Sequence, residues 1–338
     1  KLKRNYTFFI IFATALCYHS MKRVDVDIHD SDCLIGKPQV ATIGFFDGVH
    51  LGHRYLISQL HPQAGEESMV VTFDRHPLAI LRPDLHPHVL SSPDIKLLLL
   101  SYTNVDNVAV LHFDADMASL SSREFMRQIL RDRLNVRRLV LGYDNHFGKR
   151  EKASDEGFED YAAYGRELGI DVKRAAEWTN GGEKVSSSVI RRYLQSGDIE
   201  LANERLGYEY TIVGKVIHGF QEGRKMGFPT ANIDTAEWGQ MLPSPGVYAV
   251  KVRLKNSMSW HWGMMNIGMR PTFDGHEQTS EIHIIDFSGD IYGETLLVKF
   301  ISRIRQEQRF NSHEALTEQL KKDREQVETM KHIDGSII

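Results

Sequence analysis

The sequence predicts an α/β domain built on a doubly wound, Rossmann-like parallel sheet, followed by an all-β, six-stranded antiparallel barrel with a closing helix. Between Gln39 and about Gly207, short apolar runs alternate with stretches in which apolar residues recur at helical spacing. That alternation is typical of a parallel sheet with helices on both faces. Beyond Tyr208, strand-like runs follow one another through turns that contain Gly and Pro, as in small barrels. The length of 338 residues suits two domains, which we place at residues 21–207 and 208–331.

In the first domain, five apolar runs are candidate strands and six segments are candidate helices. The strands are Val40–Phe46, Met69–Phe73, Val108–Phe113, Arg138–Tyr143 and Ile170–Ala175. The helices are His50–Leu60, Pro93–Tyr102, Ser121–Leu134, Asp155–Leu168, Ser187–Gln195 and Ile199–Leu206. Because ligands of doubly wound sheets bind at the carboxyl ends of the strands, we expect the functional residues of this domain at that edge.

In the second domain, a series of strands precedes a single helix. The strands are Tyr210–His218, Gly246–Leu254, Trp260–Ile267, Glu281–Phe287 and Leu296–Ile304. The helix follows Asn311, with Ser312 as its N-cap and Ala315, Leu316 and Leu320 on its apolar face. Five or six strands closed by one helix indicate a small antiparallel barrel.

The composition excludes several classes of protein. A net charge of −4 gives no general attraction to nucleic acid or to an anionic membrane. The second half has no basic stripe with interleaved aromatic residues, which argues further against nucleic-acid binding. The two cysteines, Cys17 and Cys33, cannot by themselves form a disulfide framework or a zinc site, which fits a reducing, cytoplasmic compartment.

The first twenty residues combine a basic start with an apolar stretch from Phe8 to Cys17. This stretch is too short to span a bilayer but resembles the core of a signal peptide. We expect residues 1–20 to be an extension upstream of a natural start at Met21, so that the mature protein carries no membrane segment.

The stretch from Gln39 to Leu60, QVATIGFFDGVHLGHRYLISQL, indicates a strand, a tight turn and a helix. His50 and His53 lie three residues apart, so both imidazoles should face the same way on the first helical turn. Free N–H groups and the helix dipole favour a phosphate there, and two protonatable rings would add donors. Gly48 and Gly52 remove side chains where a nucleotide would approach the backbone. The alternative is two surface histidines at an ordinary helix start.

The segment GFFDGVHLGH within this stretch resembles the nucleotide-binding signature of the bacterial bifunctional riboflavin kinase/FAD synthetases. The first domain of that family is an adenylyl-transferring nucleotidyltransferase. The resemblance implies nucleotide contacts at Gly44, Phe46 and Asp47 and catalytic roles for His50 and His53. Phe45 stands where the family often has asparagine, a departure that concerns only a neighbour of the loop.

Two further blocks resemble the family in the same order. VTFDRHPLAIL contains Asp74 and His76, and LGYDNHFGK contains Asp144. The resemblance implies that these residues help to hold the nucleotide or the flavin. On its own, Asp-x-His-Pro would be an ordinary strand end. His146 stands where arginine is frequent in the family, which would weaken one phosphate contact.

A fourth block, VSSSVIRRYL, places Ser186, Ser187 and Ser188 at a helix start, with Arg191 about one turn on. In the family, this element lies across the phosphates of ATP, so the resemblance gives Arg191 a catalytic role. Ser188 replaces threonine and keeps the hydroxyl. By composition alone, a serine triplet before an apolar helix is more often a cap.

The second domain carries its own signature in GKVIHGFQEGRKMGFPTANI, which resembles the riboflavin kinase domain. Thr230 and Asn232 lie two apart on an extended segment and so on one face, and their oxygens suit Mg²⁺. The resemblance puts the phosphates of ATP and the Mg²⁺ here, against residues of the flanking loop. These are Gly219, Gly223, Lys225, Gly227 and Pro229. A glycine-rich hairpin turn is the alternative, and the P-loop pattern is absent.

Three downstream residues complete the expected kinase site. Glu281 is expected to open a strand, and in the family the matching glutamate accepts the proton of the riboflavin 5′-hydroxyl. Arg305 and Phe310 match the last family motif and are expected in the flavin pocket.

The resemblance therefore implies two successive reactions on one flavin. The barrel would phosphorylate riboflavin to FMN with ATP, and the first domain would adenylylate FMN to FAD with release of pyrophosphate. The expected partners are ATP, riboflavin and FMN, with Mg²⁺ as cofactor, and an oligomer stays open. The alternatives are a catalytically inactive flavin- or nucleotide-binding sensor and a nucleotidyltransferase with another acceptor.

Overall fold

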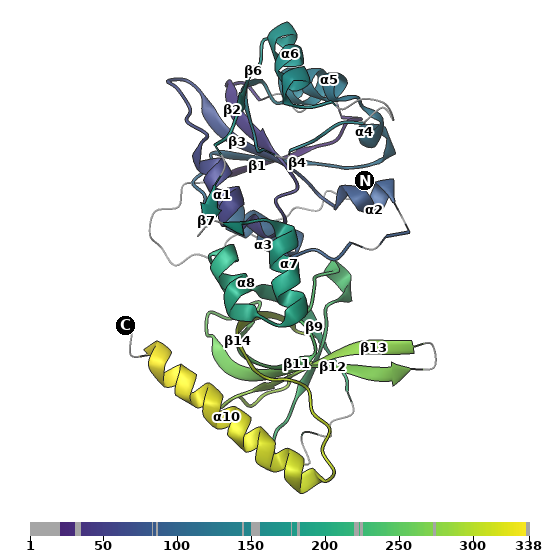
Figure 1. Ribbon diagram of the computed structural model, residues 1–338, viewed down its shortest axis with the longest axis vertical. Coiled ribbons are helices and arrows are strands. Elements are labelled where there is room, and N and C mark those ends of the chain that lie inside the picture. The colour runs from purple at the N-terminus through teal and green to yellow at the C-terminus, as the bar shows by residue number, and fades with distance from the viewer. Residues whose placement is uncertain are drawn as a thin grey trace.

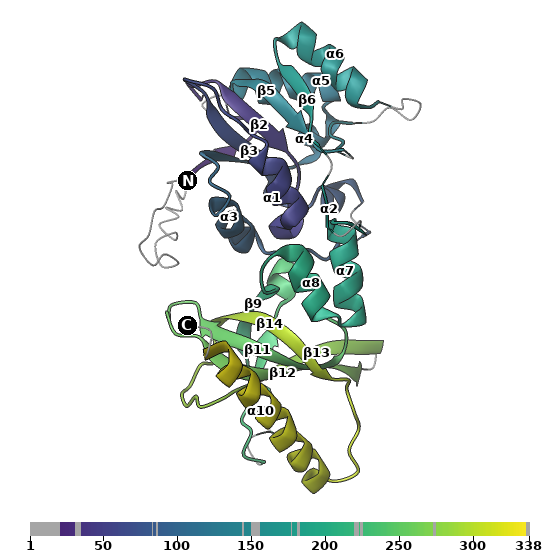
Figure 2. The ribbon, with the colours of Figure 1, turned by 60° about the vertical axis from the view of Figure 1, so that its left-hand side comes forward.

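A parallel sheet and a closed barrel lie at opposite ends of an elongated molecule, with two helices between them (Figures 1 and 2). The computed structural model describes residues 21–335 apart from 31–34, 83, 86, 144, 150–155, 177, 181–182, 220–222, 224–225 and 273–274. The expected N-terminal extension, both cysteines and the candidate residues Asp144 and Lys225 lie outside the described residues. Among the described residues, no helix is long and apolar enough to cross a membrane.

The sheet has six parallel strands in the order β1-β4-β3-β2-β5-β6. They are β1 (Lys22–Val26), β2 (Gln39–Ile43), β3 (Glu67–Phe73), β4 (Asn107–Leu111), β5 (Val136–Leu141) and β6 (Asp171–Arg174). The five expected strands are confirmed as β2 to β6. The edge strand β1 was not expected, because its sequence KRVDV is mostly charged, as is common where only one neighbour pairs.

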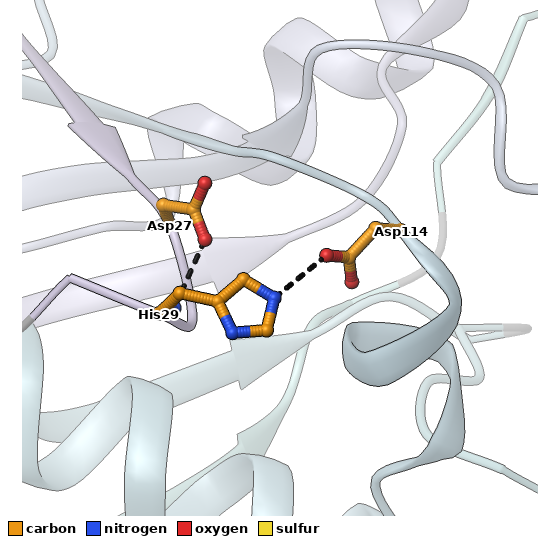
Figure 3. A group of neighbouring side chains, drawn as sticks. All are labelled: Asp27, His29 and Asp114. Carbon is orange, nitrogen blue, oxygen red and sulfur yellow. Dashed lines mark hydrogen bonds and ion pairs between the residues drawn. The ribbon is translucent and has the colours of Figure 1, made fainter.

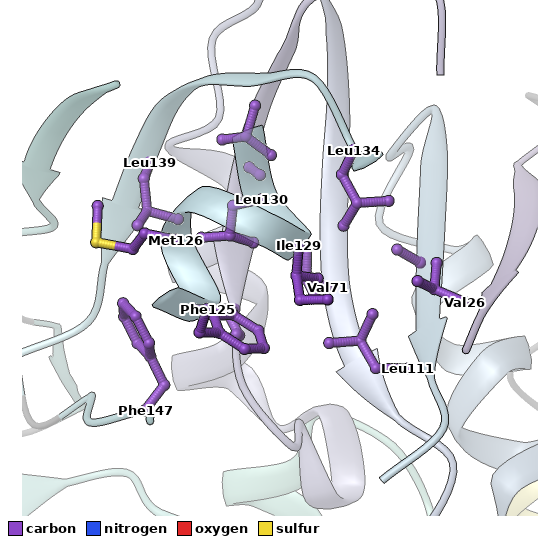
Figure 4. Close-up of a cluster of buried hydrophobic side chains, with 14 of the residues drawn as sticks. Val26, Val71, Leu111, Phe125, Met126, Ile129, Leu130, Leu134, Leu139 and Phe147 are labelled. Atoms are coloured by element: carbon purple, nitrogen blue, oxygen red, sulfur yellow. The ribbon is translucent and has the colours of Figure 1, made fainter. Parts of the chain in front are cut away.

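Alternate residues of the strands pack on opposite faces of this sheet, as a doubly wound fold requires. On one face, Met69 and Val71 pack in a cluster with Phe125, Ile129 and other side chains (Figure 4). On the other face, Val70 joins a cluster with residues from helices α1 and α3. The prediction of a doubly wound parallel sheet is therefore confirmed.

The helices follow the predicted order with differences at several places. The described ones in this half are α1 (Leu51–Ser58), α2 (Pro77–Leu81), α3 (Pro93–Ser101), α4 (Ala115–Ser119), α5 (Ser122–Phe125), α6 (Phe158–Leu168), α7 (Ser187–Ser196) and α8 (Ile199–Leu206). The helix expected over 121–134 is divided into α5 and a π-helical segment, η2 (Met126–Arg133). The helices α2 and α4 were missed because five residues are too few to show a helical period. Two-residue strands β7 (Thr179–Asn180) and β8 (Glu183–Lys184) pair before α7.

The barrel closes in the order β10-β13-β12-β11-β14-β9, with antiparallel pairing throughout. Its strands are β9 (Thr211–Ile217), β10 (Ala231–Asp234), β11 (Gly246–Leu254), β12 (His261–Thr272), β13 (Gly275–Ile284) and β14 (Thr295–Arg305), with the short helix η3 (Ala236–Trp238) after β10. The predicted barrel is confirmed, but Glu281 does not open its strand. The hairpin of β12 and β13 continues in register to Thr272 and Gly275, so Glu281 lies well inside β13.

The closing helix α10 (His313–Gly335) crosses the outside of the barrel (Figures 1 and 2). Ser312 caps it as expected, because its hydroxyl accepts a hydrogen bond from Ala315 N at 3.2 Å. Leu320 packs against the buried Val327 and barrel residues. Ala315, however, is exposed and does not belong to the packed face; that face lies further along the helix.

Helices α7 and α8 pack into the barrel although they follow the sheet in sequence (Figure 1). Ile190, Leu194 and Leu206 belong to the same buried cluster as Tyr210 and Phe300 of the barrel. Helices α7 and α8 therefore lie between the sheet and the barrel, and their apolar side chains join the core of the barrel.

Candidate functional site

A cavity of about 400 Å³ opens at the carboxyl ends of the parallel strands, where ligands are expected. We call it the sheet cavity. It is lined by residues 43–47, 50, 52, 53, 55, 56, 76, 142, 143, 145, 175, 176, 178, 185–187 and 191. Among the sequence-predicted residues, the structure brings these to its wall: Gly44, Phe46, Asp47, His50, Gly52, His53, His76, Ser186, Ser187 and Arg191.

The turn after β2 is held in an unusual backbone conformation. Phe46 and Gly48 have φ values of 54° and 75°, in the left-handed region. A Cβ added to Gly48 would lie 3.1 Å from Leu90 Cβ, so this glycine faces the protein interior, not the cavity. Gly48 is therefore needed for the left-handed backbone of the turn and, contrary to the expectation, does not make room for a nucleotide. Gly52, by contrast, lines the cavity.

The two histidines stack on one another. Their ring centroids are 3.6 Å apart with an interplanar angle of 15°. His50 is the N-cap of α1, and its Nδ1 accepts a hydrogen bond from His53 N at 3.2 Å. Burial, reinforced by the neighbouring His50 ring, lowers the pKa of His53 well below its ordinary value. Of the two protonatable rings expected here, His53 is therefore a neutral imidazole at physiological pH.

Asp47 is a buried carboxylate that organises the cavity wall. Its Oδ1 accepts hydrogen bonds from Leu90 N at 2.8 Å and Ser91 N at 3.3 Å. Its Oδ2 accepts from the Arg191 guanidinium. Burial raises the pKa of Asp47, and Arg191 opposes that rise. Asp47 therefore fixes Arg191 at the cavity wall and does not point into solvent to meet a ligand.

The serine triplet is a helix cap, as its composition indicates, and it also lies at the cavity, as the family resemblance implies. Ser186 is the N-cap of α7, and its hydroxyl accepts from Val189 N at 3.4 Å. The Ser187 hydroxyl donates to Asp47 O at 3.1 Å. Ser188 is exposed and lies outside the lining of the cavity. The cap thus presents the N-terminus of α7 to the cavity.

The block after β3 is divided between the cavity and the sheet. His76 lines the cavity, and burial lowers its pKa. Asp74 does not line it; its carboxylate accepts from Phe113 N at 3.1 Å and lies 2.8 Å from His112 Nδ1. Asp74 therefore joins the ends of β3 and β4.

Sequence reasoning missed several residues of the cavity. Trp178 and Tyr55 line it, and their stacked rings have centroids 6.1 Å apart. Tyr143 and Asn145 line it from the loop after β5. Tyr143, Asn145 and Trp178 could have been indicated by their positions at or after the ends of candidate strands, and Tyr55 by its place in the helix expected to start at His50. Lys96, directly behind the wall, carried a clearer signal, since it interrupts the apolar helix sequence IKLLLL.

A second cavity, of about 540 Å³, opens in the barrel. We call it the barrel cavity. It is lined by Val216, Pro229, Thr230, Ala231, Ile282, Ile284, Phe287, Ser288, Gly289, Asp290, Ile291 and Tyr292. Its lining comes from strands β9, β10 and β13, from the turn before β10 and from the loop after β13.

Three predicted residues of this half lie together beside the barrel cavity. Asn232 on β10 and Glu281 on β13 are paired in register, and the Thr230 hydroxyl lies 3.4 Å from Glu281 Oε2. A hydroxyl, an amide and a carboxylate thus converge at one edge. These are hard oxygen ligands of the kind that Mg²⁺ prefers.

Two glycines lie unusually close to this group. A Cβ on Gly219 would lie 1.8 Å from Asn232 Nδ2, and one on Gly223 would lie 2.3 Å from Phe228 O. Any side chain at either position would displace the Asn232 amide or the Pro229–Thr230 turn. Gly227 has φ 79° and precedes that turn.

Arg305 and Phe310, which the resemblance assigns to the flavin pocket, contact each other, and Arg305 also contacts helix α10. Arg305 forms an ion pair with the buried Asp323 of α10, with Nε to Oδ2 at 2.9 Å. Its guanidinium lies 5.6 Å from the centre of the Phe310 ring. Both residues are outside the lining of the barrel cavity, and their contacts tie α10 to β14.

A further polar cluster lies at the edge of the sheet. Asp27, His29 and Asp114 offer ligand atoms within 4.8 Å of one another (Figure 3). His29 Nε2 lies 3.1 Å from Asp114 Oδ2, and Asp27 Oδ1 accepts from His29 N at 2.9 Å. Because these atoms already satisfy one another and the His29 side chain is exposed, we interpret the cluster as a tie between the segment after β1 and α4.

The chain thus combines a doubly wound sheet with a six-stranded barrel, and each of the two has its own cavity. A family model described as FAD synthetase matches residues 35–189, and one described as riboflavin kinase matches residues 206–331. The chain belongs to the bifunctional riboflavin kinase/FMN adenylyltransferase family. Curated members from Bacillus subtilis and Haemophilus influenzae are 37% and 38% identical, over 85% and 86% of this chain and 90% and 92% of theirs.

A further curated relative agrees with this assignment, and a solved structure has the same fold. A bifunctional riboflavin kinase/FMN adenylyltransferase of Escherichia coli K12 is 37% identical over 84% of this chain and 90% of its own length. Among solved structures, a chain from Streptococcus pneumoniae titled a macrolide-efflux protein superposes with a TM-score of 0.79 at 30% identity. That match covers 90% of this chain and 98% of the other.

Proposed function

We propose that this chain phosphorylates riboflavin to FMN with ATP at its barrel cavity and adenylylates FMN to FAD at its sheet cavity. Pyrophosphate leaves in the second reaction. The observation that carries the proposal is that both family motifs surround separate cavities within one chain. We assign residues 21–207 to the adenylyl transfer and 208–331 to the kinase, and we place both reactions in the cytoplasm, where ATP is supplied.

In the adenylyl transfer, a phosphate oxygen of FMN attacks the α-phosphorus of ATP, and the bond to pyrophosphate breaks. Such a reaction depends mainly on positioning and on stabilising the negative charge that develops. The N-terminus of α7 and the Arg191 guanidinium, which Asp47 holds in place, supply donors at the cavity wall. His50 and His53 contribute from the start of α1, His53 as a neutral donor and not as a cation.

In the kinase reaction, the riboflavin 5′-hydroxyl attacks the γ-phosphorus of ATP and ADP leaves. Glu281 accepts the hydroxyl proton as a general base, and its position beside Thr230 and Asn232 supports this role. The Thr230 hydroxyl and the Asn232 amide oxygen would hold Mg²⁺, which neutralises phosphate charge when it is bound. The close approach of Gly219 and Gly223 to this edge fits a tight cradle around the ion and the phosphates.

The test is a product assay on the intact protein. Incubation with riboflavin, ATP and Mg²⁺ should accumulate FMN and then FAD on a chromatogram, and supplied FMN should give FAD directly. An inactive sensor would bind flavin without forming either product. A transferase with another acceptor would form no FAD from FMN, and either result would contradict the proposal.

A further inference from the structure

Lys96 is a buried cation that the reactions described above do not use. It lies in α3, which starts at the cap Ser92, and only 4% of it is exposed. Its neighbours Ile95 and Leu97 are buried as well. Removing an ammonium group from water costs several kcal/mol unless other groups compensate, and lysines are rarely buried without such a reason.

The ammonium group makes three hydrogen bonds, and none of them is to a carboxylate. Nζ donates to Phe73 O at 2.8 Å, to Phe45 O at 3.3 Å and to Thr72 Oγ1 at 3.3 Å. An ammonium group has three donors, so its hydrogen-bonding capacity is used. Its charge, in contrast, is not neutralised by a contacting acid among the residues that the structure describes.

These contacts place Lys96 directly behind the sheet cavity. Phe45 follows β2, and Thr72 and Phe73 end β3, so one side chain ties together the ends of two adjacent strands. Nζ also lies 4.1 Å from the centre of the Phe45 ring, and that ring packs edge-on against His76 at 4.6 Å. Both Phe45 and His76 line the cavity.

We propose that Lys96 is a positioning residue for adenylyl transfer, whose fixed positive charge steadies the phosphates of ATP and whose hydrogen bonds hold the ends of β2 and β3 in place. This inference rests on the function proposed above for the sheet cavity. A charge acts strongly across a medium of low dielectric constant, and a bound polyphosphate would supply the negative charge that Lys96 lacks.

The electrostatics give this role a measurable signature. Burial lowers the pKa of Lys96 to about 8, although Asp47 and Asp74 oppose the shift. The other titratable groups that face it are His53 and His76, whose pKa values are lowered and so move away from the alkaline range. Lys96 therefore loses its charge as the pH rises through about 8.

The test measures kcat/KM for ATP in the conversion of FMN to FAD between pH 6.5 and 9.5. The variants are Lys96→Met, which removes the charge, and Lys96→Arg, which keeps it at high pH, with the exposed Lys173→Met as control. Because kcat/KM reports the pKa values of the free enzyme, the wild type should lose activity above about pH 8. Lys96→Met should be reduced about 10- to 100-fold at pH 7 and should lack this decline.

Lys96→Arg should restore activity at least in part and move the decline to higher pH by more than about one unit. FMN formation by the same molecules should stay unchanged in every variant, which reports that the barrel is intact. A Lys96→Met protein that is weakened but still declines above pH 8 would overturn the electrostatic role, and so would one with unchanged activity. If Lys96→Met does not fold, the wild-type and Lys96→Arg profiles decide the matter.

The two proposals can fail separately. A wild type that forms no FAD contradicts the proposed function, and ATP binding by calorimetry at pH 7 and pH 9 then still tests Lys96. Binding should weaken at pH 9 in the wild type but not in Lys96→Arg. Equal binding at both pH values in the wild type would overturn the role of this lysine.

Discussion

The two cavities are built on different physical principles. At the sheet cavity, buried charged groups set the geometry: Asp47 holds Arg191, and Lys96 joins two strand ends. Beside the barrel cavity, the geometry is set by the close approach of the backbone at Gly219 and Gly223 to Asn232 and Thr230. In the first site, removing a charge should do the damage. In the second, adding a single carbon atom should be enough.

The difference follows from the two folds. The ends of parallel strands converge at one edge, where side chains from several loops meet and buried ions can be held by backbone groups. A small barrel is filled by its own apolar side chains, so its site must lie on a turn at the mouth.

The largest effect is expected for Glu281→Gln. The amide cannot accept the proton of the riboflavin hydroxyl, so FMN formation should fall about 10²- to 10⁴-fold. Conversion of supplied FMN to FAD should continue at the wild-type rate, as both steps can be followed by chromatography. Glu294→Gln, at an exposed barrel position, serves as control. Undiminished FMN formation in Glu281→Gln would remove this residue from the reaction.

A methyl group alone should impair the barrel cavity. In Gly219→Ala, the new Cβ would lie 1.8 Å from Asn232 Nδ2, so the amide must move. Displacement on this scale should lower kcat/KM for FMN formation about 10- to 100-fold. Gly36→Ala is the matched control, since a Cβ there meets nothing within 4 Å. If both variants behave like the wild type, close approach is not what builds this site.

At the sheet cavity, the isosteric change Asp47→Asn should uncouple Arg191. The amide keeps a hydrogen-bond acceptor for Leu90 N but no longer neutralises the guanidinium. We expect kcat/KM for FAD formation to fall about tenfold or more, since the guanidinium is no longer held at the wall. FMN formation should not change. Asp171→Asn, on exposed β6, is the control, and equal losses in both would contradict the argument.

The smallest effect concerns stability and pH. The pKa of His53 is lowered in the folded protein, so the unfolded chain binds the proton more readily as the pH falls below the ordinary histidine value. The stabilisation is therefore complete above about pH 6.5 and declines towards acid, by up to about 1.4 kcal/mol per pH unit. Thermal unfolding at pH 7.5 and 5.5 should show a smaller decline in His53→Asn than in the wild type or in the exposed His61→Asn. A decline of equal size in all three would show that His53 is not buried as a neutral ring.

Sequence reasoning found the architecture because both folds leave a strong periodic signal. The apolar runs that became β2 to β5 are buried on both faces, and such runs are readily recognised. β1 and β10 were not identified as strands because one is charged and the other has only four residues. The start of β13 was predicted at Glu281 and not at Gly275, because the residues HEQTS before Glu281 are polar and gave no strand signal.

The motifs located the sheet cavity but not the way in which its residues act. Proximity of His50 and His53 followed from their spacing, whereas the neutrality of His53 depends on burial that no spacing reveals. Asp47 was expected at the site and lines the cavity, but its ion pair with Arg191, 144 positions away in the chain, was not predicted. Arg305 was assigned to the flavin pocket by a motif, and its ion pair with Asp323 was not predicted. Long-range partners of this kind are decided by the tertiary fold.

Helix α7 contacts both the sheet cavity and the barrel. Its first turn lines the sheet cavity, while barrel residues cap its last turn: Ser244 N donates to Leu194 O, and Arg303 Nη1 donates to Ser196 O at 3.0 Å. A chain divided after residue 207 would lose these two donors from the barrel and would uncover Ile190 and Leu194. A chimera that combines one half of this chain with the other half of a relative should therefore keep residues 187–206 and the barrel from the same protein. Otherwise, the contacts between these helices and the barrel must be redesigned.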